Sequence, residues 1–146
     1  MVSLWNGLAA LVLSHPWIYP ALETLHLMGL AALFGGLLIF ELRMLGRATA
    51  LDPSALARLS VPVALAGFAL CAVTGVALFS AHADELWVSN ALRLKMALIL
   101  IAGANALWFH WRGGVRAQDR MARWQCLLSL GLWVTVIVCG RWIAVV

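Results

Sequence analysis

Four long apolar segments dominate the residue pattern, and a short polar stretch separates each from the next. They run approximately over residues 20–45, 53–81, 90–111 and 117–143. A helix that crosses the hydrocarbon core of a bilayer needs about 20 mostly apolar residues. Each segment meets that length, so the pattern predicts an all-α fold: a single-domain, integral membrane bundle of four transmembrane helices.

Local signals refine the ends of these elements. The second span starts at Asp52 and Pro53. Asp is a good N-cap residue, and Pro is well suited to the first position of a helix. Pro62 lies further inside the second span and is a candidate kink. Residues 3–14 form an apolar run too short to span, so we expect a short N-terminal interfacial helix with Trp5 as its anchor.

Composition places the chain among membrane proteins. Hydrophobic residues make up 64% of the sequence and charged residues only 11%, and the mean hydropathy is +0.97. Soluble domains carry about 25% charged residues. The net charge of +4 does not indicate nucleic acid, because the basic residues lie in short loops and form no stripe on a soluble face. The expected surroundings are a lipid bilayer.

The basic loops predict an orientation. Seven of the ten Lys and Arg residues flank the loops after the first and third spans, which the positive-inside rule assigns to the cytoplasm. Both termini and the loop at residues 80–90 then face outward. We therefore expect a multi-pass protein of the bacterial inner (plasma) membrane. The seven residues are Arg43, Arg47, Arg58, Arg112, Arg116, Arg120 and Arg123.

Six ionisable residues interrupt the outward ends of the spans. An ionisable side chain inside a bilayer costs a few kcal/mol and normally faces the bundle interior. The alternative is snorkelling of long side chains to the headgroups. The excess of cations favours an anionic partner such as heme propionates, a quinone headgroup or an acidic substrate. The six are Glu23, His26, His82, Arg93, Lys95 and Arg141.

Glycines accompany the histidine of the first span. Gly29 and Gly36 share one helix face beside His26 and define a shallow groove for a flat macrocycle. Close helix packing through small residues is the alternative use of such a face. In the second span a stripe of small residues that includes Gly75 leads to His82. Because the two spans are antiparallel, we expect both imidazoles at similar depth.

Neutral imidazole is a usual axial ligand of heme iron. We predict His26 as one axial ligand of a b-type heme. His82 or Lys95 is the expected second ligand, and His15 remains open as well. His110 lies about 20 Å along the third span from this level and cannot share the site.

Three segments carry a family resemblance: "HLMGLAALFGGLLIFELRMLG", "PVALAGFALCAVTGVALF" and "NALRLKMALILIAGANALWFH". Together they resemble an uncharacterised group of four-span bacterial inner-membrane proteins over nearly the whole chain. The first is also similar to the opening span of CopD-like and HemJ-like proteins, and HemJ-like proteins bind heme b and oxidise protoporphyrinogen IX. The resemblance implies that His26 matches their span-one histidine and Lys95 their span-three lysine. Leu33 stands where HemJ-like proteins usually carry tryptophan.

The sequence thus predicts an inner-membrane heme b protein that acts in electron transfer, with Arg93 and Arg141 paired with the propionates. One alternative is a HemJ-like protoporphyrinogen IX oxidase. Another is a non-heme subunit that handles copper or assists complex assembly, although the five Met and three Cys form no clear pathway of soft ligands. The expected partners are a quinone or a protein redox partner, and either a homodimer or a larger membrane complex. Catalytic residues, and whether the protein is an enzyme, stay open.

Overall fold

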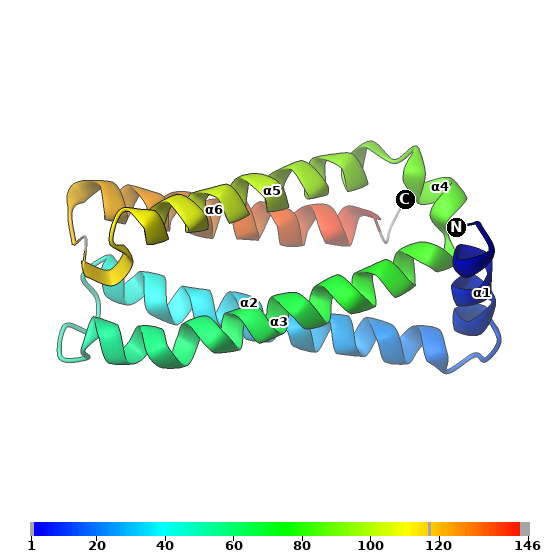
Figure 1. Cartoon of the computed structure of the whole chain (residues 1–146), viewed down its shortest axis with the longest axis horizontal. Helices are drawn as coiled ribbons and strands as arrows, with labels where there is room; N and C mark the ends of the chain where they lie inside the picture. Colours follow the sequence, from blue (N-terminus) through cyan, green and yellow to red (C-terminus); the bar gives the residue numbers. More distant parts are fainter. Residues whose placement is uncertain (1, 117, 144–146) are drawn as a thin grey trace. The chain divides into compact units, whose positions relative to one another are not determined.

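The computed structural model describes residues 2–116 and 118–143, and over these residues the chain is helical, without strands. This confirms the all-α prediction and the short N-terminal helix. Figure 1 shows the elements in chain order: α1 (Val2–Leu13), α2 (Ile18–Met44), α3 (Pro53–Ala81), α4 (Ala83–Trp87), α5 (Asn90–Trp111), the 3-10 turn η1 (Gly114–Arg116) and α6 (Arg120–Ile143).

Four of these helices are long and apolar enough to cross a membrane, as the sequence predicts: α2, α3, α5 and α6. Their bounds follow the predicted spans closely, and α6 begins at Arg120, while residue 117, where the predicted span starts, lies outside the described residues. A cap precedes α6, because an Asp119 carboxylate oxygen accepts the Ala122 backbone N–H at 2.8 Å. The identity of the membrane and the sides of the termini stay predictions.

The helices form two compact units, and α2 and α3 each contribute one half to both. The first unit holds the chain up to Gly35 together with Val63–Val88, and the second holds Gly36–Pro62 together with the chain from Ser89 onward. In the first unit α1 lies across the ends of α2 and α3 (Figure 1). There the Trp5 ring meets the Phe79 ring edge-on, with centroids 6.1 Å apart.

Direct backbone contact joins α2 to α3 in the first unit. A Cβ atom added at Gly67 would lie 2.5 Å from both the Gly29 carbonyl oxygen and the Leu33 backbone nitrogen. Membrane helices use small residues for such an approach, because in lipid they gain little from hydrophobic burial and associate through packing.

The second unit has an apolar core where α2, α5 and α6 meet. Phe40 and Met44 of α2 pack with Ala122 and Cys126 of α6, and all four are buried. Phe109 of α5 joins this core, with its ring edge-on to Phe40 and the centroids 6.1 Å apart.

Candidate functional site

His26 links α2 to α3. Its ring is half-buried, and Nδ1 lies 2.9 Å from Oγ1 of Thr74, which is 3% exposed. The Thr74 hydroxyl itself donates to the Leu70 carbonyl at 2.7 Å. A second link crosses the same helix pair, because the Cys71 thiol donates to the His26 carbonyl at 3.3 Å.

The Thr74 hydroxyl favours one tautomer of His26. A threonine hydroxyl has one proton, and the short bond to the Leu70 carbonyl is the place for it. With that bond formed, Oγ1 accepts from Nδ1, which then carries the ring proton. A neutral imidazole with its proton on Nδ1 has its lone pair on Nε2. Metal-ligating histidines in proteins are held in the same way, by a hydrogen bond from the nitrogen that does not bind the metal.

The glycine face beside His26 is not an open groove. A Cβ atom at Gly29 would lie 2.9 Å from the Gly67 carbonyl oxygen and 3.0 Å from the Cys71 sulfur. At Gly75, the nearest atom is Cε1 of the His26 ring itself, at 3.4 Å from the added Cβ. Helix packing therefore occupies the predicted position of a macrocycle at Gly29. Gly36 is buried in the second unit.

His82 is not at the level of His26. It is exposed, precedes α4, and places its ring edge-on to Tyr19 with centroids 5.6 Å apart. Tyr19 comes seven residues before His26 on α2, which is about 10 Å of helix rise. Two axial imidazoles need their nitrogens within about 4 Å of each other, because metal–imidazole bonds are about 2 Å long. The expected pairing of His26 with His82 at similar depth therefore does not appear in the structure.

His82 lines a small hollow of the first unit instead. The hollow has a volume of about 290 Å³ and lies between α1, the end of α3 and α4, with Trp5, Ser80 and Asp84 in its wall. Ordinary ligand pockets measure about 300–1,000 Å³. The hollow therefore lies at the lower end of the range of ligand pockets.

Most of the six predicted polar residues are exposed. In the first unit this applies to Glu23 as well as His82, and in the second unit to Arg93 and Arg141. Their exposure favours the snorkelling alternative. Lys95 is half-buried and packs against α6, where a Cβ atom added at Gly140 would lie 3.3 Å from its Nζ.

Histidine and acidic side chains of the described residues, 2–116 and 118–143, gather into no metal cage. Within the described part of the chain, no group of three or more His, Cys, Asp or Glu side chains is arranged to hold a metal ion.

The structure adds a buried carboxyl that is not among the six ionisable residues singled out in the sequence. Glu41 of α2 is 4% exposed, and the Ser129 hydroxyl of α6 lies within hydrogen-bonding reach. A signal was present in the sequence, because Glu41 is an acidic residue inside the first predicted span, between the apolar Phe40 and Leu42.

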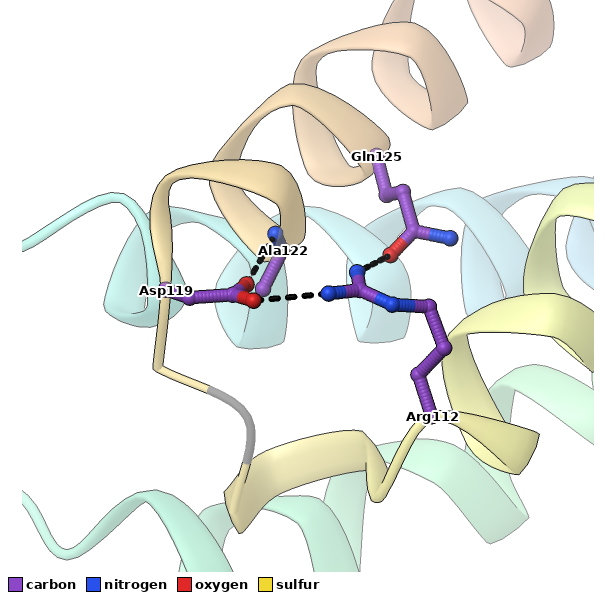
Figure 2. A network of polar contacts seen from close by, with 4 residues as sticks. All are labelled: Arg112, Asp119, Ala122 and Gln125. Carbon is purple, nitrogen blue, oxygen red and sulfur yellow. Dashed lines mark hydrogen bonds and ion pairs between the residues drawn. The ribbon is translucent and has the colours of Figure 1, made fainter.

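A network of polar contacts joins α5 and α6 in the same unit, and Figure 2 shows the contacts around Arg112. Arg112 donates to Gln125 Oε1 at 3.1 Å and to an Asp119 carboxylate oxygen at 2.7 Å. The Asn105 amide donates to the Gln125 backbone carbonyl at 3.0 Å. The Ala122 N–H, together with the Arg112 guanidinium, holds the pKa of Asp119 below its usual value.

Comparisons with known proteins add no relative: no family model, no curated protein and no solved structure matches the chain.

Proposed function

We propose that this protein is a membrane-embedded heme b protein that acts in electron transfer, with His26 as an axial ligand. One observation supports the proposal most: Nδ1 of His26 bonds a hydroxyl whose only proton is already donated elsewhere. This arrangement favours the tautomer that coordinates through Nε2. His26 lies on α2, which is long and apolar enough to span a membrane.

The proposed site uses fewer residues than the sequence predicts. His26 would hold the iron and Thr74 would fix the orientation of the ring. A heme would supply one-electron redox chemistry. Gly29 and Gly75 take no part, because α3 and the His26 ring already fill their faces. Lys95 as the second ligand, and Arg93 and Arg141 as partners of the propionates, stay predictions from the sequence alone.

The direct experiment is the heme content of the protein purified after expression with added heme. His26→Ala should lose the heme, and His110→Ala should keep it, because His110 is exposed on α5. Equal heme content in the two variants would contradict the proposal. Circular dichroism of both variants shows whether each is folded.

The hydrogen bond to Thr74 gives a finer test. Outer hydrogen-bond partners of metal ligands typically contribute about 10–100-fold in affinity. Thr74→Val removes the hydroxyl that accepts from Nδ1 and keeps the shape of the side chain. The affinity for heme should therefore fall by about 10–100-fold, and the reduction potential of the heme should shift. Thr74→Ser keeps the hydroxyl and should behave like the wild type. A Thr74→Val protein with unchanged affinity and potential would refute the assigned role.

The contact between Gly29 and Gly67 favours a second candidate, a non-heme membrane subunit. In that case the His26–Thr74 bond only holds two helices together, as polar residues do in many membrane bundles. This candidate predicts no heme in the wild-type protein. It also predicts that His26→Ala lowers the unfolding free energy by about 0.6–1.7 kcal/mol, the usual contribution of such a bond in membranes.

A further inference from the structure

Glu41 is an acidic residue in the interior of the second unit. It lies on α2, which is apolar enough to span a membrane, and only 4% of its surface is exposed. Its carboxyl oxygen Oε2 is buried and has no hydrogen-bond partner among the described residues. An ionised carboxylate buried without a partner costs far more than a protonated one, so acids in such places take up a proton. Ionisable residues inside spans frequently belong to proton relays.

The charged groups around Glu41 do not neutralise it. On α6 its neighbours are Ser129 and Cys126, neither of which is a cation. The Arg43 guanidinium, two residues later on α2, is turned to the loop and donates to the Leu51 and Thr49 carbonyls. On α5 the Arg112 guanidinium is engaged by Gln125 and Asp119.

Polar side chains lie in a row between Glu41 and the end of the unit where α5 and α6 meet. Ser129 and Gln125 lie one turn apart on α6, which places their Cβ atoms about 6 Å apart. Both are buried, and the Gln125 Nε2 atom is also without a partner among the described residues. Arg112 then joins Gln125 to Asp119, which is exposed (Figure 2). The row therefore runs from an exposed carboxylate to a buried one.

We infer that Glu41 is a proton-binding site within the membrane, and that it exchanges its proton with water at the α5–α6 connection along the row Ser129, Gln125, Arg112 and Asp119. The step involves only a proton. The Glu41 O–H bond breaks, the proton passes to a water molecule, and the carboxylate remains until a proton returns. No oxidant or reductant is needed, so the inference does not depend on heme.

A proton fits this place better than a metal cation. A cation would need several oxygen ligands, and the described acidic residues do not gather around Glu41. A proton needs one oxygen atom and removes the charge from the interior. The unpartnered Glu41 oxygen and Gln125 amide are a potential acceptor and a donor, which suits water-assisted transfer between them.

Infrared difference spectroscopy of the protein in lipid tests the inference. The wild type should show the C=O band of a protonated carboxyl at neutral pH, and Glu41→Gln should lack it. Glu85→Gln, which changes an exposed carboxylate on α4, should keep the band. Should Glu41→Gln fail to fold, Glu41→Asp keeps a carboxyl and should shift the band. A wild type without the band, or a band that neither Glu41 variant alters, would overturn the inference.

The route is tested by the rate at which the same band shifts in D₂O. Gln125→Met keeps an unbranched side chain but removes the amide, and exchange should slow by about tenfold, a barrier change of ~1.4 kcal/mol. Thr135→Val is the control, because Thr135 is on the exposed side of α6. Equal exchange rates in the two variants would refute the proposed path.

Discussion

Gly67→Ala is the substitution that most sharply tests how α2 and α3 meet. The added methyl group would lie 2.5 Å from the Gly29 carbonyl oxygen and from the Leu33 nitrogen, whereas ordinary contact begins at 3.4 Å. Each contact is therefore 3.4 − 2.5 = 0.9 Å too short. Both neighbouring atoms belong to the backbone, so no side chain can rotate away, and the helices must separate.

The energetic cost follows from two opposing terms. Overpacking a well-packed interior typically costs about 1–3 kcal/mol, and the rigid backbone contacts place Gly67→Ala near the upper end. Alanine gains about 1 kcal/mol over glycine in a helix interior. The net loss should be about 2 kcal/mol, and since 1 kcal/mol shifts the melting temperature of a chain of this size by about 2–4 °C, Tm should fall by about 4–8 °C.

Gly35→Ala is the matched control, because it lies on α2 and a Cβ atom there meets nothing within 4 Å. It should gain up to about 1 kcal/mol from helix propensity alone. Thermal unfolding in detergent micelles, followed by circular dichroism, compares the two variants. If Gly67→Ala is as stable as Gly35→Ala, the close contact of α2 and α3 is not present in the protein.

Three further predictions concern the α5–α6 connection. The Ala122 N–H and, after it, the Arg112 guanidinium lower the pKa of Asp119 in the folded protein. The ionised Asp119 therefore stabilises the fold fully above the unfolded-state pKa of about 3.9. This stabilisation is lost as the pH falls through the lower, folded-state pKa. Amide exchange at Ala122 should accelerate in that range, and constant protection there would contradict the cap. Arg112→Met leaves Gln125 Oε1 buried without its donor and should cost about 1–3 kcal/mol in unfolding free energy; a neutral result would argue against the network. Asn105→Ala removes one bond to the Gln125 carbonyl and should cost about 1 kcal/mol in the same assay, while an unchanged midpoint would show that the bond contributes nothing.

The fold could be predicted from the sequence because backbone groups in the hydrocarbon core of a bilayer find no water to bond with. Long apolar runs must be helical so that their backbone groups bond internally, and the four runs indeed become α2, α3, α5 and α6. The start of α6 was less accessible, since Asp119 caps the helix and Arg120 is its first residue.

The candidate site was only partly accessible, because periodicity shows which residues share a face and not what covers it. The face of Gly29 could hold a ring or another helix, and only the packed structure shows that α3 fills it. His82 was expected level with His26, but it lies beyond the end of α3, beside Tyr19. Glu41 was passed over because burial of a carboxyl depends on neighbours from α6, which are far away in the sequence.

Titration of heme into the purified protein, followed by its absorption spectrum, tests the central claim most directly. The account predicts a saturable Soret band for the wild type and none for His26→Ala under the same conditions. A wild-type protein that shows no saturable band, or a His26→Ala variant that titrates identically, would contradict the role of His26 as an axial ligand.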